Sequence, residues 1–304
     1  MKKERIDLDF LERKVKNLAR LSTLPHVAAK VTEMVENPRT SASTLAKIIS
    51  SDQVLAARIL RLANSAYYGF PRKISTINLA IVVLGFNALR DLVLSIAVVD
   101  RFLENQPDSV DMDQFWRHAL IVGMGARAIS RLSGYPVPGE CFVTGLVHDI
   151  GYLVLVQHFS ALFEEIYQVA QETNCPFREA EKRVLGITHS DIGAWLAEGW
   201  NLPEKLVQAV KYHHEPEKAL VHTDLVWIIH WADKVSYTIG EGNGFPAEEA
   251  IDPDQVEQEL QKHFKVNWPL AFYQRKFEEE SHKVNDFLAI LTQPPKPVKR
   301  FESV

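Results

Sequence analysis

The chain has 304 residues, of which 46% are apolar and 24% are charged, close to the average of globular proteins. This composition excludes an intrinsically disordered chain, and the length is enough for one large domain or two smaller ones. The net charge of -5 gives no overall attraction to nucleic acid or to anionic lipid, although a local basic patch is compatible with it.

The cysteine content and the apolar segments indicate the cellular compartment of the protein. Cys141 and Cys175 are the two cysteines, too few for a disulfide framework, which favours a reducing compartment. The first residues, MKKERIDLDFLERK, contain no apolar segment of signal-peptide length. The run from Leu79 to Phe102 is interrupted by polar residues between positions 87 and 91, so we expect a core helix there. Together these features predict a soluble cytoplasmic protein without a membrane span.

The elements expected are helices, because helix start and stop signals recur at short intervals and strand-like alternation is scarce. The fold class predicted is therefore all-α. Near the N-terminus, Ser43 or Thr44 is expected to cap a short helix that ends at about Ser50. Asp52 is expected to cap the helix that follows.

An aromatic turn precedes the most apolar part of the chain. Tyr67, Tyr68 and Phe70 lie in a turn with Gly69 and Pro71, and they form either a partner surface or, more often in such turns, a plug of the core. Ser75 or Thr76 precedes the run from Leu79 to Val99, whose density of Val, Ile and Leu predicts a pair of helices buried on most sides.

A polar segment at 105–112 (NQPDSVDM) predicts a connection between two helical subdomains. After it, Asp113 is expected to cap a helix through Leu132, and a second helix is expected from about Glu140 to His158. The segment 240–246 (GEGNGFP) is expected to be a loop. Further helices are expected over residues 160–174, 176–186, 188 onward, 203–213, 220–240, 253–264 and 270–291, with a Pro-rich tail at 293–304.

The candidates for chemistry are seven His and Asp residues on five predicted helices: His118, His148, Asp149, His189, His213, His214 and Asp233. Imidazole and carboxylate ligands suit iron, manganese, nickel or zinc, and the absence of a Cys-x-x-Cys motif argues against a thiolate zinc site. Adjacent residues on a helix diverge by about 100°. An adjacent pair therefore serves one metal, or two metals about 3.5–4 Å apart with Asp149 as the bridge.

The alternative is that these residues are ordinary core or surface residues. For any one of them alone this is the better interpretation, whereas the whole set favours metal binding. The remaining histidines are expected to be solvated or to have packing roles: His26, His158, His222, His230, His263 and His282. No Gly-rich phosphate loop, Ser-His-Asp arrangement or nucleic-acid motif is present in the sequence.

The order of motifs resembles a known family. The stretches WRHALIVGMGARAIS, FVTGLVHDIGYLVL, GITHSDIGAWLAEGW, AVKYHHEP and IIHWADKV resemble the HDOD (HD-related output) domain of bacterial signalling proteins. The upstream sequence from LPHVAAKVTEM to LRDLVLS is similar to the N-terminal half of that domain. The resemblance covers about Leu21 to Ile239 and implies an HD-superfamily helical domain with an additional N-terminal helical subdomain.

The same resemblance implies a domain division. It consists of an N-terminal helical arm over 1–20, an HDOD domain over 21–240 with subdomains 21–108 and 109–240, and C-terminal helices and tail over 241–304.

The wider HD superfamily binds metal through a first His, an adjacent His-Asp pair and a late Asp, which are matched here by His118, His148, Asp149 and Asp233. The HD-GYP branch, which hydrolyses cyclic di-GMP, adds three histidines on a second metal. These are matched in order by His189, His213 and His214. The resemblance therefore implies a divalent-metal site with a dinuclear ligand set.

Two features depart from the HD-GYP branch. That branch continues HDIG with Lys, whereas this chain has Tyr152 and so lacks a cation that would hold a phosphate. The stretch after His214, EPEKALVHTDL, contains no Gly-Tyr-Pro. Neither position supplies a metal ligand, so the departures disfavour phosphodiester hydrolysis and leave metal binding unaffected.

Three functions remain. The favoured one is a signal-transduction output module in which metal or a ligand biases the conformation presented to a signalling protein. The alternative is a metal-dependent phosphohydrolase acting on a nucleotide or a cyclic dinucleotide. A purely structural scaffold would require the seven aligned residues to be incidental. The expected partners are a signalling protein and a nucleotide ligand.

Overall fold

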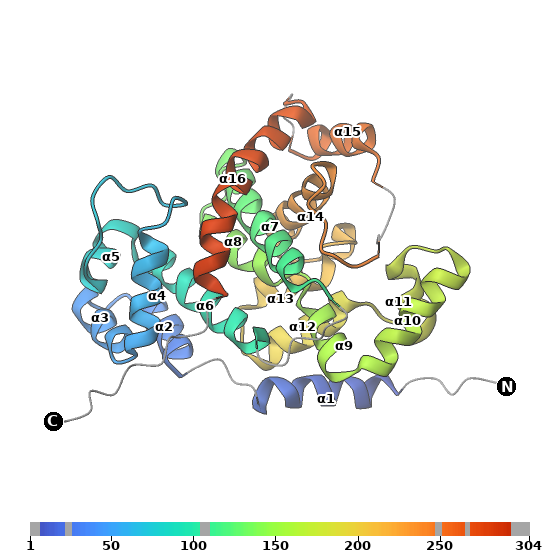
Figure 1. The fold of residues 1–304 in the computed structure, drawn as a ribbon, viewed down its shortest axis with the longest axis horizontal. Coiled ribbons are helices and arrows are strands. Elements are labelled where there is room, and N and C mark those ends of the chain that lie inside the picture. The colour runs from blue at the N-terminus through green and yellow to red at the C-terminus, as the bar shows by residue number, and fades with distance from the viewer. Residues whose placement is uncertain (1–6, 22–25, 104–109, 247–250, 265–267, 293–304) are drawn as a thin grey trace.

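The computed structural model describes residues 7–21, 26–103, 110–246, 251–264 and 268–292. Within these ranges the chain folds entirely into helices and connections, without a strand, so the predicted all-α class is confirmed (Figure 1). The helices are α1 (Leu8–Leu21), α2 (His26–Glu36), α3 (Ala42–Ser50), α4 (Gln53–Ala63), α5 (Ile77–Leu84), α6 (Phe86–Leu103), α7 (Met112–Leu132), α8 (Pro138–Val147), α9 (Ile150–His158), α10 (Ser160–Thr173), α11 (Phe177–Leu185), α12 (His189–Gly199), α13 (Glu204–Tyr212), a 3₁₀ turn (Pro216–Lys218), α14 (Thr223–Thr238), α15 (Pro253–Phe264) and α16 (Leu270–Leu291).

The first helices, α2 to α5, lie together on one side of the molecule, in blue in Figure 1. Asp52 caps α4 as predicted, because its carboxylate accepts the N–H groups of the second and third helical residues at 3.0 Å each. The predicted cap of α3 was wrong by two or three residues. Ser41 caps this helix, since its hydroxyl accepts the N–H of Thr44 at 3.2 Å.

The predicted apolar helix pair exists as α5 and α6, which diverge by 118° at Gly85. Thr76 caps α5, as one of the two predicted candidates. Helix α6 is buried as predicted, with twelve buried residues. Helix α5 is not, because Val82 is 76% exposed. The short α5 buries one face on α3, α4 and α6 and leaves the other face open.

Two predictions in the second half require correction. Asp111, rather than Asp113, caps α7 and accepts the N–H of Gln114 at 3.0 Å. The single helix predicted over Glu140–His158 is divided into α8 and α9, with Asp149 outside helical geometry at φ -97° and ψ 9°. Apolar residues continue through this break, so the hydrophobic pattern did not reveal it.

The segment Pro138–His158 is long and apolar enough to span a membrane, but 94% of its most apolar part is buried within the fold, as in the core helix of a folded domain. The bend between α5 and α6 divides the other apolar run. The cytoplasmic location expected from the sequence stays a prediction.

The remaining helices follow the prediction closely, apart from α14. That helix begins at Thr223 rather than at Leu220, because His222 adopts a left-handed conformation (φ 54°) and Leu220 is 92% exposed. Gly186 ends α11 in the left-handed conformation, as expected. The predicted connection at 105–112 lies mostly outside the described residues, and the tail at 293–304 lies wholly outside them.

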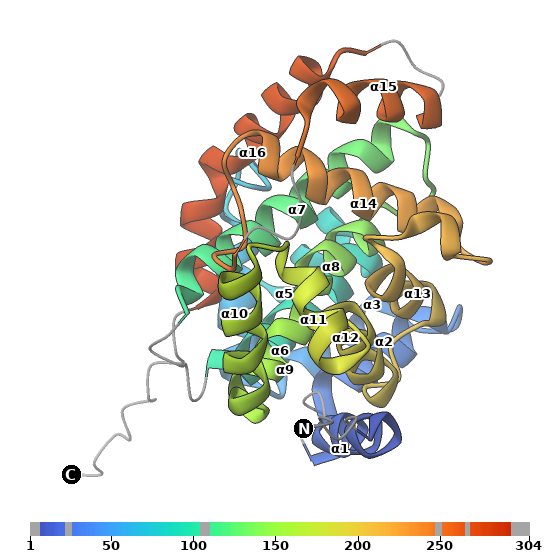
Figure 2. The same cartoon turned by 90° about the vertical axis from the view of Figure 1, so that its right-hand side faces the viewer.

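The C-terminal helix α16 joins the two halves. It runs along α7 and also contacts α4 and α6, in red in Figure 1. The Arg58 guanidinium on α4 donates to the carbonyl of Leu291 and to Asp100 of α6. On the opposite side, α1 packs beneath α12 (Figure 2).

Candidate metal centre

The seven predicted residues come from separate parts of the chain. His118 lies on α7, and His148 with Asp149 forms the break between α8 and α9. The other four are His189 at the first position of α12, His213 and His214 directly after α13, and Asp233 on α14. The structure brings all seven into one cluster, with their donor atoms in two adjoining groups.

The first group consists of His118, His148, Asp149 and Asp233. The Nε2 atom of His118 lies 3.3 Å from Oδ1 of Asp233 and 3.4 Å from Nε2 of His148. The Nε2 atom of His148 lies 3.3 Å from Oδ2 of Asp149 and 3.6 Å from Oδ1 of Asp233. Ligands about 2.0–2.2 Å from a tetrahedral metal are about 3.3–3.6 Å apart, so the distances of the two imidazoles from each other and from these carboxylate oxygens match those of a metal site.

The second group uses the other oxygen of Asp149. Its Oδ1 atom lies 3.4 Å from Nε2 of His189 and 3.4 Å from Nε2 of His213. The Nε2 atom of His214 lies 3.1 Å from that of His189. These four residues could hold an ion together, as could His118, His148 and Asp149. Asp149 thus faces the two groups with its two oxygens, which is the geometry of a bridging carboxylate.

The backs of the imidazole rings are fixed by hydrogen bonds. In four rings Nδ1 donates to an oxygen: His118 to the carbonyl of Glu241 (2.7 Å), His148 to that of Gly145 (2.7 Å), His213 to that of Val210 (2.7 Å) and His189 to the carboxylate of Glu181 (2.9 Å). Such bonds set the tautomer, so the Nε2 lone pairs face the cluster as ligand atoms.

Several atoms inside the cluster lack a hydrogen-bond partner within the described part of the chain. Oδ1 of Asp149, Oδ1 of Asp233 and Nε2 of His213 are buried in this way. Unpartnered buried polar atoms are rare and costly, and cations bound in the two groups would satisfy all three. The residues present therefore fit a bound metal.

The electrostatics of the cluster also favour a cation. Burial by itself lowers the pKa of His148, but the carboxylates of Asp149 and Asp233 outweigh it and raise that pKa well above its usual value. Burial lowers the pKa of His213, and lowers that of His214 further. These two rings are thus neutral, which is the form that binds metal.

The loop at 240–246 closes over the cluster, and its contribution was not found from the sequence. Asn243, which is 1% exposed, donates from Nδ2 to Oδ2 of Asp149 at 2.8 Å. Glu241 supplies the carbonyl that holds His118, and its carboxylate pairs with Arg117. The only sequence signal was that this Gly-rich segment follows the helix of Asp233.

Tyr152 has a second effect beyond the missing cation. Its ring is fully buried and stacks on the ring of His189, with centroids 3.9 Å apart, and on Phe245 of the loop at 4.4 Å. An aromatic wall therefore lies where the HD-GYP pattern has a Lys. Glu181 is another residue that sequence analysis missed, because it lies eight positions before the histidine that it holds.

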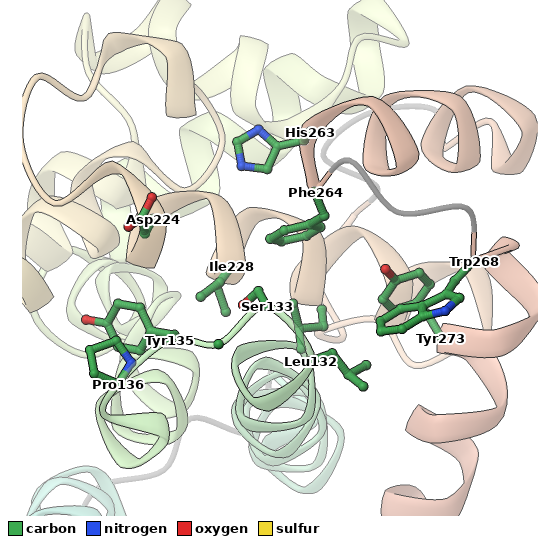
Figure 3. Close-up of a pocket in the computed structure, with 12 residues that line it drawn as sticks. Leu132, Ser133, Tyr135, Pro136, Asp224, Ile228, His263, Phe264, Trp268 and Tyr273 are labelled. Atoms are coloured by element: carbon green, nitrogen blue, oxygen red, sulfur yellow. The ribbon is translucent and has the colours of Figure 1, made fainter.

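Six of the seven residues are buried, between 0% and 4% exposed, and His214 is partly exposed. Within the described part of the chain the cluster is therefore mostly buried, with His214 at its edge. A sizeable pocket of about 350 Å³ lies elsewhere, at the C-terminal end of α7, and none of the seven residues lines it (Figure 3).

The other histidines lie apart from the cluster's donor atoms. His230 is buried and donates to the carbonyl of His213 at 2.7 Å, so it has the packing role expected. His263 stacks on Trp227 at 4.2 Å. The remaining four are exposed: His26, His158, His222 and His282.

The HDOD domain family matches residues 21–216, which is more than half of the chain. The chain belongs to the HDOD family. An HDOD domain protein of unknown function from Geobacter sulfurreducens is 25% identical, with a TM-score of 0.74 over 91% of this chain and 97% of that protein. A candidate phosphohydrolase from Shewanella amazonensis SB2B is 26% identical, with a TM-score of 0.74 over 92% and 97% of the two chains.

An uncharacterised protein of Treponema pallidum (strain Nichols) is 27% identical over 199 residues. The match includes 64% of this HDOD chain but 38% of the relative, so this chain is similar to a minor part of that longer protein.

Proposed function

We propose that this HDOD protein is a signal-transduction output module whose buried His and Asp cluster holds two divalent ions and thereby orders the loop at 240–246. The observation that carries the proposal is the cover over Asp149 and His189: Asn243 contacts Asp149, Tyr152 stacks on His189, and Phe245 stacks on Tyr152. Structural metal sites are closed, whereas catalytic sites keep a position open for water and substrate. Metal occupancy would then change a surface that a signalling partner can contact.

The two ions are expected to differ in affinity. The first group contains the carboxylates of Asp149 and Asp233, and the second contains three neutral imidazoles and a share of Asp149. His189 also lies at the N-terminus of α12, where the helix dipole disfavours a cation by roughly a few tenths of a kcal/mol. The second ion should therefore dissociate first.

The test is metal content during a graded chelator titration, on protein purified without added metal and then loaded with a single metal. We expect two ions per chain, lost in two steps. His189→Ala and His213→Ala should each retain one ion. Loss of both ions in one step, or two ions in either variant, would contradict the dinuclear assignment. Protease protection of the 240–246 loop should fall with the metal content.

A second candidate is a metal-dependent phosphohydrolase. The bridging position of Asp149 favours it, because paired metals joined by a carboxylate activate water and stabilise phosphoryl transfer. The similarity to the Shewanella protein points in the same direction. Hydrolysis of a nitrophenyl phosphodiester and of cyclic dinucleotides can be measured with metal-loaded wild type. The same assay with Asn243→Ala tests the site after the contact of the loop with Asp149 is removed. Turnover that Asp149→Ala abolishes would support the enzyme, whereas the output module predicts none.

A further inference from the structure

A second pocket lies where the N-terminal helices, α7 and α16 meet. Its volume is about 300 Å³, near the lower end of the range for small-molecule pockets. The aromatic turn after α4 forms one wall, the last turns of α7 form another, and α16 closes the third side. This pocket, called here the junction pocket, shares no lining residue with the candidate metal centre.

The junction pocket is positively charged. Arg127 and Arg131 of α7 and Lys283 of α16 line it, against one carboxylate, that of Glu280. Lys283 is paired with Oε1 of Glu280 at 3.0 Å. Three cations around one carboxylate favour an anionic ligand, and guanidinium groups suit a phosphate in particular.

Two buried atoms in the junction pocket lack a hydrogen-bond partner in the described part of the chain. They are Nε of Arg127, which is a donor, and Oε2 of Glu280, which is an acceptor. Another nitrogen of Arg127 donates to the Tyr67 hydroxyl at 2.6 Å and so holds the guanidinium in place. These two atoms have almost no accessible surface in this conformation, so Arg131 and Lys283 are the cations that a ligand in the pocket would contact.

The aromatic wall offers a stacking surface. The rings of Tyr68 and Phe70 are nearly parallel, at 7° with centroids 6.2 Å apart, and Phe70 is 38% exposed. Tyr67 has the plug role that was one of the two alternatives from the sequence, since it packs on Phe287 of α16 at 5.4 Å. Aromatic faces beside cations are how proteins bind nucleobases attached to phosphates.

We propose that the junction pocket binds a purine nucleoside monophosphate. The base would lie against Phe70 and Tyr68, while the phosphate would lie between Arg131 and Lys283. The ligand would connect the N-terminal helices to α7 and α16. The pocket of Figure 3 is a natural comparison, because its aromatic lining carries a single formal charge, the carboxylate of Asp224.

Calorimetric titration of the full chain with AMP and GMP tests the proposal. The comparison ligands are UMP, adenosine, guanosine and inorganic phosphate. We expect one purine monophosphate per chain. The nucleosides and inorganic phosphate should bind about tenfold more weakly or worse, because each lacks half of the contacts. Equal binding of inorganic phosphate would mean an anion site only and would overturn the nucleotide assignment.

The variants Arg131→Gln and Lys283→Gln should each weaken AMP or GMP binding about tenfold, because each removes a charged hydrogen-bond donor at the pocket rim. Phe70→Ala should remove the preference for purine over UMP. Arg275→Gln, which removes the same charge from an exposed part of α16 outside the pocket, and Asp224→Asn are matched controls that should bind as wild type does. A loss in Arg275→Gln as large as in Arg131→Gln would show general charge attraction and refute the site. Metal-stripped protein should still bind, which separates this proposal from that of the metal centre.

Discussion

The side chains of the proposed metal ligands, Asp149 and the histidines around it, are held in their orientations by neighbouring residues. Glu181 illustrates this, because it is fully buried and both its oxygens accept hydrogen bonds from His189: Oε1 from the backbone N–H at 3.0 Å and Oε2 from Nδ1 at 2.9 Å. Burial raises the pKa of Glu181, while the His189 contacts oppose this shift. A single side chain therefore sets both the start of α12 and the direction of one proposed ligand.

Glu181→Gln should lower both the stability of the protein and its affinity for metal. Glutamine provides one acceptor for two donors, so one buried donor is left unpaired at a cost of about 1–3 kcal/mol in the free energy of unfolding. Loss of such a supporting contact typically lowers metal affinity about 10- to 100-fold. Urea denaturation and competition with a fluorescent chelator measure the two effects. An unchanged affinity for the more labile ion would contradict the role of Glu181.

His230 should make stability depend on pH. Burial, followed by the charge of Lys234, lowers the pKa of His230 to about 3, against 6.5 in the unfolded chain. The unfolded chain therefore binds one more proton between these values, and the free energy of unfolding should fall by up to about 1.4 kcal/mol per pH unit as the pH decreases from about 6.5. His230→Asn keeps a donor for the His213 carbonyl but does not titrate. Denaturation at several pH values should show the variant losing less stability in acid, and parallel curves would refute the effect.

At the scale of helices, close backbone contacts bring the donor groups together. A Cβ atom on Gly145 of α8 would lie 2.6 Å from the Cα atom of Gly123 on α7. A Cβ atom on Gly151 of α9 would lie 1.9 Å from the carbonyl oxygen of His189. Only glycine permits these approaches, and they place His118 beside His148, and His189 beside Asp149.

Gly145→Ala should push α7 and α8 apart, because the new methyl group meets backbone that cannot rotate away. We expect a loss of about 1–3 kcal/mol in the free energy of unfolding and weaker binding of the tighter ion. Gly193→Ala is the milder comparison, since its Cβ atom would lie 3.1 Å from a side-chain atom of Val210 and 3.3 Å from the backbone N of Gly151, against 2.6 Å for Gly145. Its gain in helix propensity, up to about 1 kcal/mol, should roughly offset the crowding. Equal losses in the two variants, measured by thermal and chemical denaturation, would contradict this interpretation.

At the scale of the whole molecule, the N-terminal helices and the HD-like half share buried surface. The nearly buried α6 packs on α8, and Arg58 of α4 holds the end of α16. The division at 108, expected from the polar segment 105–112, and that at 240 stay predictions, but these contacts indicate that the parts depend on one another.

A fragment from Asp113 onward should therefore aggregate. It would lose the buried face of α6 and expose the surfaces of α8 and α16 that α6 and α4 cover. Size-exclusion chromatography with light scattering, run beside the full chain, is the measurement. A monomeric fragment with full helical content would show that the C-terminal part folds alone.

The sequence alone determined part of what depends on neighbours within a few residues, although it misplaced the caps of α3 and α7 by two or three residues. The cap at Asp52 and the end of α11 at Gly186 involve contacts spanning four residues or fewer, so local pattern predicted them. The kinds of residue in the candidate centre were also visible, through their order along the chain and the HDOD resemblance.

Tertiary structure decided what depends on distant parts of the chain. The break of the helix at Asp149 follows an unbroken apolar pattern, and the contacts of Asn243 with Asp149 span 94 positions. The two orientations of the Asp149 oxygens and the junction pocket arise from helices that meet only after packing. Hydrophobic burial drives that packing without specifying direction, so the exact approach of two helices depends on side-chain fit across them, which no local pattern records.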